Sequence, residues 1–247
     1  MNIKIILVEP AGALNVGSVA RIMKNMGLRQ LVLVNSHCDP LSAQAQQMAV
    51  HAQDILAGAQ QVDTLAAALV GCKRAIATTA RQRSASIPLE TPRQALPWLV
   101  EENVTSALIF GPEDRGLSNS ELNYAQRFVC IPSHPNYLSL NLAQAVAVCA
   151  YELYLTSLGQ NKSQEVIKTP LEEESAPLDL LESYYQHLES ILLKIGYLYP
   201  HTTKARMEKF RRLFNRASLS REEVAMLRGI LRQIEWATSQ TSQQFKD

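Results

Sequence analysis

Short β-branched and apolar runs alternate with longer amphipathic segments over the first 158 residues of the chain. The short runs predict strands at Lys4–Val8, Gln30–Asn35, Arg74–Thr78, Ser106–Phe110 and Arg127–Ile131. The longer segments predict helices at Val16–Met26, Ala43–Ala59, Thr64–Val70, Pro92–Glu101, Ser118–Tyr124 and Ser139–Leu158. Strands that alternate with helices indicate an α/β fold with a mostly parallel sheet covered on both faces.

The pattern changes after residue 158. Residues 159–177 are polar and contain two prolines and a glutamate triplet, which is typical of a linker. Helical periodicity returns at Leu178–Ile195, Thr203–Phe214 and Ser220–Thr238, where Ser220 and Glu223 form a capping box. The sequence therefore predicts a domain over 1–158, a linker over 159–177, and a small all-helical domain over 178–247.

Composition narrows the class of protein. Hydrophobic residues make up 47% of the chain and charged residues 19%, as in a soluble globular protein. No apolar run approaches the roughly 20 residues that span a bilayer, so we expect no membrane partner. The four cysteines, Cys38, Cys72, Cys130 and Cys149, are widely separated and form no CxxC pair. This spacing favours a cytoplasmic protein without disulfides.

Charge is distributed unevenly, although the net charge is only +1. The stretch Glu172–Glu189 carries six acidic residues and no lysine or arginine. The stretch Lys194–Arg216 is basic, with Lys194, Lys204, Arg206, Lys209, Arg211, Arg212 and Arg216 against Glu208 alone. Such a density of positive charge suits phosphate contact, but on charge alone a solvated helix face explains it equally well.

Several kinds of site are excluded by their missing motifs. The chain has no GxGxxG after its first strand, and no GxxxxGK[ST], HExxH or GxSxG. Its five histidines lie far apart in the sequence, so we expect no metal site.

Three segments remain as candidates, because each lies where a predicted strand ends or a helix starts. They are Leu14–Arg21, Ile109–Leu117 and Ile131–Ala143. In the first segment Asn15 is a suitable helix N-cap, and Gly17 permits a close backbone approach. Each segment alone is also compatible with a turn or a solvated surface.

Together the three segments resemble one family. They read NxGxxxR, GxExxGL and IPxxPxxxSLNLAxAV, which in order and spacing match the SpoU branch of the SPOUT methyltransferases. The segment Ala77–Arg81 is similar to a further cofactor-contacting segment of that family. In the tail, Phe210–Ala217 and Leu227–Leu231 are similar to the C-terminal extension of the bacterial enzymes that 2′-O-methylate nucleotide 32 of tRNA.

The resemblance implies a C-terminal trefoil knot in the sheet domain, a homodimer, tRNA as the substrate, and S-adenosylmethionine as the cofactor without a metal. By position it assigns the cofactor to Thr78, Thr79, Ala80, Gly111, Ile131, Leu138, Ser139 and Leu140. It assigns the reaction to Arg21, supported by Asn15, Glu113 and Asn141. The expected RNA contacts are Lys204, Arg206, Lys209, Arg211, Arg212 and Arg216.

One departure from the family pattern concerns the second segment. The tRNA-32 enzymes carry an arginine directly after the glutamate, whereas this chain has Asp114 there and Arg115 one place later. Two alternatives to the tRNA-32 activity stay open. The first is 2′-O-methylation of ribosomal RNA or of another tRNA position. The second is a non-catalytic RNA-binding protein of the same fold.

Overall fold

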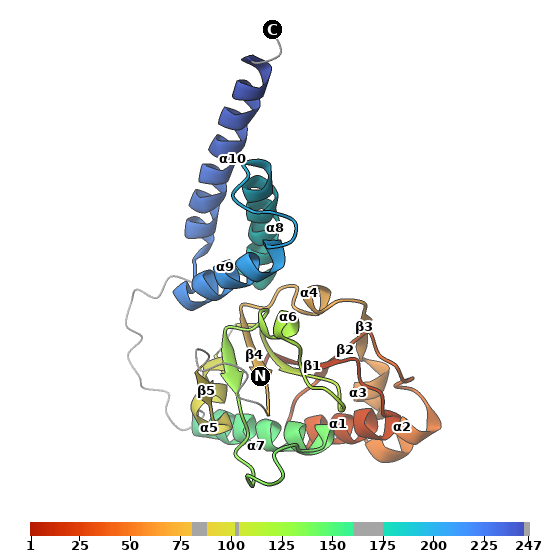
Figure 1. The fold of residues 1–247 in the computed structure, drawn as a ribbon. Helices are drawn as coiled ribbons and strands as arrows, with labels where there is room; N and C mark the ends of the chain where they lie inside the picture. The colour runs from red at the N-terminus through yellow and green to blue at the C-terminus, as the bar shows by residue number, and fades with distance from the viewer. Residues whose placement is uncertain (81–87, 102–103, 161–174, 245–247) are drawn as a thin grey trace. The chain divides into compact units, whose positions relative to one another are not determined.

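The computed structural model describes residues 1–80, 88–101, 104–160 and 175–244 (Figure 1). The chain divides into two compact units, residues 1–168 and 169–247. Most of the predicted linker, residues 161–174, lies outside the described residues, as does Arg81.

The first unit is built on one parallel sheet, as the sequence predicts. Its strands are β1 (Ile3–Val8), β2 (Gln30–Val34), β3 (Gln60–Val62), β4 (Arg74–Thr78), β5 (Leu89–Glu90), β6 (Ser106–Phe110) and β7 (Arg127–Val129). Their order is β3-β2-β1-β6-β4-β7-β5, and every neighbouring pair is parallel. Strands β1 and β6 are almost wholly buried, which explains why all of their residues except Lys4 and Ser106 are apolar. The trefoil knot stays a prediction.

Helices cover both faces of this sheet. Figure 1 shows α1 (Ala13–Asn25), α2 (Ala43–Ala49), α5 (Pro92–Ala95) and α7 (Leu142–Gln160) along one face, with α4 (Leu65–Ala68) and α6 (Asn119–Leu122) toward the other. The remaining helical elements are α3 (Gln53–Ala57) and the 3₁₀ helix η1 (Leu96–Leu99). Buried side chains of β1, β2 and β6 meet those of α1 and α7 in one core.

The structure corrects four details of the prediction. The expected helix Ala43–Ala59 is two helices, because Val50 has φ 54° and ends α2. The short strands β3 and β5 were missed. Helix α1 begins at Ala13 with Gly12 as its N-cap, so Asn15 lies in the first turn and does not cap it. Helix α7 begins at Leu142 and not at Ser139.

Gly17 has a specific packing role inside α1. A Cβ atom at this position would lie 2.2 Å from the carbonyl oxygen of Ala45 on α2. The close backbone approach expected at Gly17 therefore exists, but it is made to another helix and not to a ligand.

Helix α7 is apolar on its outer side as well as on its inner side. Val148, Tyr151, Leu155 and Leu158 recur every three or four residues and are 38–49% exposed. Leu142–Gly159 is long and apolar enough to cross a membrane by length and composition, a feature that the sequence analysis had excluded. One third of this window is buried within the protein, and core helices of soluble proteins pass the same test.

Within residues 175–244, the part of the second unit that the structure describes, there are three helices, α8 (Leu178–Lys194), α9 (Thr203–Ala217) and α10 (Arg221–Gln244). Its core includes Leu181, Tyr184, Leu188, Ile191, Leu198, Met207, Val224 and Leu231. The predicted capping box is confirmed: Ser220 N–H donates to Glu223 at 2.8 Å, and Glu223 N–H donates to Ser220 Oγ at 3.2 Å. The hydroxyl of Tyr185 donates to the buried Asn215 at 2.9 Å and joins α8 to α9.

Candidate active site

A cavity opens where three neighbouring strands, β6, β4 and β7, reach their carboxyl ends. The loops that follow these strands line the cavity together with the start of α7, as expected for ligand sites in parallel sheets. The cavity encloses about 860 Å³, its open mouth included. Its lining contains every residue that the family resemblance assigns to the cofactor, namely Thr78, Thr79, Ala80, Gly111, Ile131, Leu138, Ser139 and Leu140.

The loop after β6 forms one wall of this cavity and is tightly closed. Gly116 N–H donates to the carbonyl of Pro112 at 2.9 Å. A Cβ atom on Gly111 would lie 2.3 Å from the backbone nitrogen of Leu117. Only glycine therefore permits this close approach without moving the loop. Four apolar lining residues were not predicted as cofactor contacts, although their positions in or beside the motifs could have indicated that role: Phe110, Leu117, Val129 and Leu142.

Three residues from the three sequence motifs form one chain of hydrogen bonds beside the cavity. Asn141 Nδ2 donates to Asn15 Oδ1 at 3.0 Å, and Asn15 Nδ2 donates to Glu113 Oε1 at 2.9 Å. The Oδ1 atom of Asn141 also accepts from the N–H of Ala143 at 2.9 Å. This chain joins the first turn of α1, the loop after β6 and the start of α7.

The carboxylate of Glu113 ends this chain at the N-terminus of α1. It accepts from the backbone N–H of Ala11 at 3.3 Å and of Gly12 at 3.4 Å. Partial burial is the largest influence on the pKa of Glu113 and would raise it. The hydrogen bonds from Asn15 and from backbone N–H groups outweigh burial, and the pKa of Glu113 lies below its usual value. Glu113 is therefore ionised near neutral pH and acts only as an acceptor.

Arg21 lies apart from this chain. It is exposed on α1, it does not line the cavity, and it makes no hydrogen bond or ion pair with another described residue. The structure thus brings together Asn15, Glu113 and Asn141, but it leaves the guanidinium of Arg21 free for an external anion.

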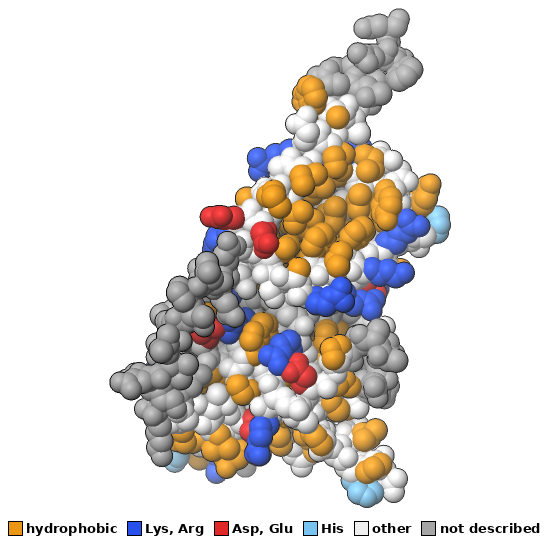
Figure 2. Space-filling model, turned by 90° about the vertical axis from the view of Figure 1, so that its left-hand side faces the viewer, with side chains coloured by type: hydrophobic (Ala, Val, Ile, Leu, Met, Phe, Trp, Pro, Cys, Tyr) orange, Lys and Arg blue, Asp and Glu red, His pale blue; other side chains and the backbone are white. Residues whose placement is uncertain are grey.

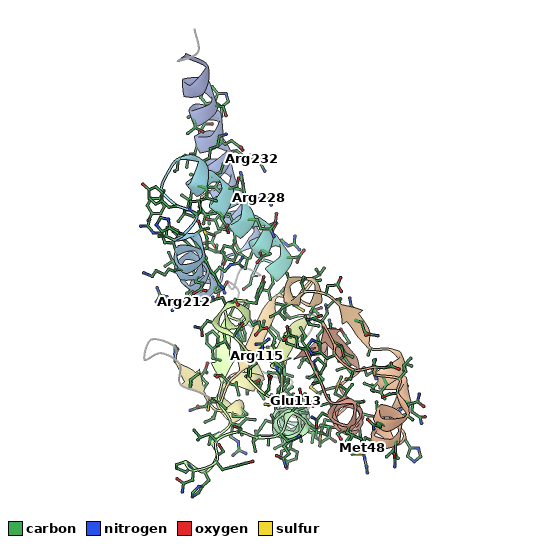
Figure 3. The ribbon with its side chains drawn as sticks, turned by 45° about the vertical axis from the view of Figure 1, so that its right-hand side comes forward. Met48, Glu113, Arg115, Arg212, Arg228 and Arg232 are labelled. Carbon is green, nitrogen blue, oxygen red and sulfur yellow. The ribbon has the colours of Figure 1, made fainter. Side chains whose placement is uncertain are left out.

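Arg115, which lies one place after the position where the family pattern has its arginine, is held on both sides by carboxylates. Its guanidinium donates to Glu121 at 2.9 and 3.1 Å and to Glu9 at 2.6 Å. Figure 3 labels Arg115 together with Glu113 of the same loop. These bonds raise the pKa of Arg115 above its ordinary value. Glu9 ends β1 in a left-handed conformation, φ 48°, as Asn35 ends β2 with φ 46°. Asn35 Nδ2 donates to Glu9 Oε1 at 3.4 Å. Arg115 therefore connects the cavity loop to the carboxyl end of β1.

The basic residues of α9 do not all face solvent. Arg211 is only 17% exposed and forms a two-bond ion pair with Glu182 of α8, so the acidic and basic segments of the tail partly neutralise each other. Its guanidinium also lies 4.6 Å from the centre of the Tyr185 ring. Because its guanidinium is engaged in this ion pair, Arg211 is not among the RNA contacts that we propose.

Four other basic residues share the outer side of α9: Arg206, Lys209, Arg212 and Arg216 are spaced three or four residues apart and are all exposed. Lys204 is also exposed. The buried residues Thr203, Met207 and Asn215 define the opposite, inner side.

Within the described ranges, no group of three or more His, Cys, Asp or Glu side chains is arranged to hold a metal ion. The four cysteines are free thiols. Burial raises the pKa of Cys149 to about 12, which makes it unreactive.

Both units match known families. Residues 2–151 match the SpoU rRNA Methylase family, and residues 179–244 match the C-terminal domain of tRNA methyltransferase TrmJ. The tRNA (cytidine/uridine-2'-O-)-methyltransferase TrmJ of Klebsiella pneumoniae is 44% identical over 239 residues, 95% of this chain and 96% of the relative. The protein of the same name from Escherichia coli K12 is 44% identical over 237 residues, 95% of each chain.

A solved structure agrees with these matches in three dimensions. The crystal structure of TrmJ from Z. mobilis ZM4 superposes with a TM-score of 0.82 at 34% identity, covering 94% of this chain and 98% of that one. Since the likeness extends over both units, the chain belongs to the SpoU methylase family and, within it, to the TrmJ group.

Proposed function

We propose that this protein is an S-adenosylmethionine-dependent methyltransferase that methylates the 2′-hydroxyl of a cytidine or uridine ribose in tRNA. The observation that carries the proposal is the cavity beside the Glu113–Asn15–Asn141 chain, because three separate motifs of a methyltransferase family converge there. The relatives that match over 95% of the chain are named for this activity.

The cavity fits the cofactor chemically. Its apolar residues Val129, Ile131 and Leu142 suit the faces of an adenine ring, and its three loops offer backbone groups for the ring edge. Glycine at position 111 lets the loop after β6 close against its own residues Gly116 and Leu117, which gives the cavity a defined wall. When bound, S-adenosylmethionine would supply a sulfonium methyl group to the ribose 2′-oxygen. The sulfur–methyl bond would break, S-adenosylhomocysteine would leave, and the 2′-hydroxyl proton would pass to solvent.

Arg21 would act on the RNA and not on the cofactor. A guanidinium is a poor proton acceptor near neutral pH, but it binds phosphate in a fixed geometry and stabilises developing negative charge. We propose that Arg21 binds the phosphate next to the target ribose and stabilises the forming alkoxide. Asn15, Glu113 and Asn141 are positioning residues, since their hydrogen bonds fix α1, the helix that carries Arg21, relative to the cavity loops.

We further propose a homodimer in which each cavity is completed by the partner's Arg21. Two observations support this arrangement: Arg21 does not line the cavity of its own chain, and the outer side of α7 exposes Val148, Tyr151, Leu155 and Leu158.

Residues 1–158 would form the methyltransferase domain and 178–247 a tRNA-binding extension. The exposed basic residues of α9 would then contact tRNA phosphates, namely Lys204 and, on its outer side, Arg206, Lys209, Arg212 and Arg216. The target would be nucleotide 32 of the anticodon loop, in the cytoplasm.

Mapping of ribose methylation tests the proposed function. RNA from a deletion strain should lack one 2′-O-methyl group in the tRNA anticodon loop, and expression of this chain should restore it. Calorimetry with S-adenosylmethionine should show binding by the purified protein. A restored methyl group in ribosomal RNA would replace the tRNA assignment, and the absence of cofactor binding would favour a non-catalytic RNA-binding protein.

A further inference from the structure

The connection between α8 and α9 displays three aromatic side chains within five residues. Tyr197 and Tyr199 are 52% and 54% exposed, while Leu198 between them is buried. Gly196, with φ 76°, turns the chain after α8, and Leu198 N–H donates to the carbonyl of Leu192 at 3.0 Å. The buried leucine thus fixes the connection, and its two neighbours are presented outward.

These rings are held in place without being covered. The Tyr199 carbonyl accepts from the N–H of Thr202 at 2.8 Å and from the N–H and hydroxyl of Thr203 at 3.0 and 2.8 Å. The ring of Tyr199 is stacked with that of exposed His201 at 6.0 Å and 21°. Backbone positions fixed in this way reduce the entropy that a ligand must remove when it binds.

Positive charge lies beside the rings. Arg206 donates to the carbonyl of Tyr197 at 2.9 Å, and its guanidinium lies 5.4 Å from the centre of the Tyr197 ring. Arg206 also belongs to the exposed basic side of α9, with Lys209, Arg212 and Arg216. Figure 2 shows Lys and Arg side chains at the margin of an area of hydrophobic side chains on the face of this unit that it draws; the hydrophobic colour of the figure also covers tyrosine. A single exposed aromatic residue on a protein surface needs no explanation, but this short connection holds a stacked pair and a ring beside a guanidinium.

We propose that Tyr197, Tyr199 and His201 form a stacking platform for unpaired bases of the tRNA, with Arg206 and the outer side of α9 binding the flanking phosphates. Aromatic rings stack on any base, whereas basic side chains bind the backbone, so the combination recognises single-stranded RNA. The proposal rests on the proposed tRNA methyltransferase activity and names the feature of the substrate that the tail recognises. A paired stem offers no free base face to these rings.

The test compares full-length wild type with the double variant Tyr199→Leu/His201→Leu and with Tyr199→Phe. The matched control is Trp236→Leu, which removes another exposed aromatic ring, 58% exposed, from α10. Binding is measured by fluorescence anisotropy at several salt concentrations with two probes, an unmodified tRNA transcript and a blunt RNA duplex with the anticodon-stem sequence. Thermal unfolding of each variant checks that it is folded.

We expect the leucine double variant to bind the transcript about tenfold more weakly, since stacking contributes that order per base. Its affinity for the duplex and its salt dependence should stay at wild-type values, because stacking releases no counterions. Tyr199→Phe and Trp236→Leu should bind like wild type. The triple variant Lys209→Gln/Arg212→Gln/Arg216→Gln should instead flatten the salt dependence for the transcript by about 2 in log–log slope.

Two results would overturn the platform. One is an unchanged transcript affinity in the leucine double variant, and the other is an equal loss of affinity for transcript and duplex. In either case, methylation of tRNA by the wild type would leave the proposed function standing. If the wild type neither binds nor methylates the transcript, the proposed function fails and the platform fails with it.

Discussion

At the scale of single residues, the site separates into groups that are held and one group that is free. Hydrogen bonds join Asn15 to both Glu113 and Asn141, and two carboxylates form ion pairs with Arg115. Arg21 alone among the expected reaction residues has no partner in the described part of the chain. A cation that is not neutralised within its own protein is suited to an external phosphate.

Removal of the Arg21 guanidinium should therefore affect the reaction and not the cofactor. We expect Arg21→Ala to lower the methyl-transfer rate by about 100-fold or more, as loss of an electrostatic contact to the transition state does. Affinity for S-adenosylmethionine, measured by calorimetry, should stay within a few-fold. Arg21→Lys should keep part of the activity if a point charge suffices and lose it if two-point binding is required.

Lys24→Ala provides the matched control for this prediction. Lys24 is exposed on the same helix, but it is paired with Asp54 at 2.6 Å. Its loss should leave the methyl-transfer rate near that of the wild type. A parallel fall of cofactor binding and turnover in Arg21→Ala would contradict the role proposed for Arg21.

Glu113 should make the stability of the first unit depend on pH. Its pKa is lowered in the folded protein, so its ionised form stabilises the fold above the unfolded pKa, and this contribution is lost as the pH falls through the folded pKa. We expect Glu113→Gln to reduce the free energy of unfolding by about 1 kcal/mol at pH 7. The gap between the two proteins should narrow as the pH falls below about 4.

Urea unfolding at pH 7 and at progressively lower pH measures this gap. The exposed Asp63, which makes no hydrogen bond in the described structure, supplies the control variant Asp63→Asn. That variant should follow the wild type at every pH. A constant gap for Glu113→Gln across the same range would show that its effect comes from packing and not from ionisation.

At the scale of elements, helix packing depends on a few close contacts. Gly17→Ala places a methyl group 2.2 Å from the Ala45 carbonyl, so α1 and α2 must separate. We expect the free energy of unfolding to fall by about 1–3 kcal/mol. Gly159→Ala, in the same unit and with open space around its Cβ, should raise it by up to about 1 kcal/mol. Chemical denaturation of both variants measures the difference, and equal effects would refute the packing role of Gly17.

The long elements could be predicted from the sequence, whereas short or interrupted ones could not. Strands β1, β4 and β6 each carry a short apolar run and were placed within one residue. Strand β3 is Gln60–Val62, and its two polar residues give no strand pattern. The break between α2 and α3 occurs at Val50, a β-branched residue with positive φ that no propensity favours.

The candidate site could likewise be predicted only in part, because some of its contacts depend on the three-dimensional fold. The family resemblance identified the loops around the cavity and many of the residues that line it. It could not reveal that Asn15 contacts Glu113, 98 positions away, because that contact depends on the order of the strands. It also could not show that Arg211 turns inward to Glu182, since charge alone does not indicate the partner.

At the scale of the whole molecule, the outer side of α7 is the surface through which we expect two copies of the chain to associate. A helix that is apolar on all sides is normally covered, and the described structure covers only one side of α7. We expect Tyr151→Glu/Leu155→Glu to convert a dimer into a monomer in sedimentation velocity at micromolar concentration, with loss of methyl transfer. Val70→Glu, at an exposed apolar residue outside α7, should remain dimeric and active.

Mixed dimers test the shared site directly. Arg21→Ala and Gly111→Val should each be nearly inactive, the first through the reaction and the second through the cofactor loop. When the two are mixed and allowed to exchange subunits, one cavity per mixed dimer should regain both an intact loop and the partner's Arg21. Activity should then rise well above that of either variant alone. No recovery after proven exchange would show that each chain uses its own arginine.

The two left-handed residues that follow β1 and β2, Glu9 and Asn35, have a consequence for protein engineering. Glu9 and Asn35 occupy a backbone conformation that costs most residues about 1 kcal/mol or more and that glycine adopts freely. A redesign guided by backbone geometry alone would place glycine at both positions. Glycine at 9 would remove a carboxylate that holds Arg115, and glycine at 35 would remove the amide that holds Glu9. A higher melting temperature obtained there would come with a looser cavity wall, so heat resistance is a misleading criterion for improvement at these two sites.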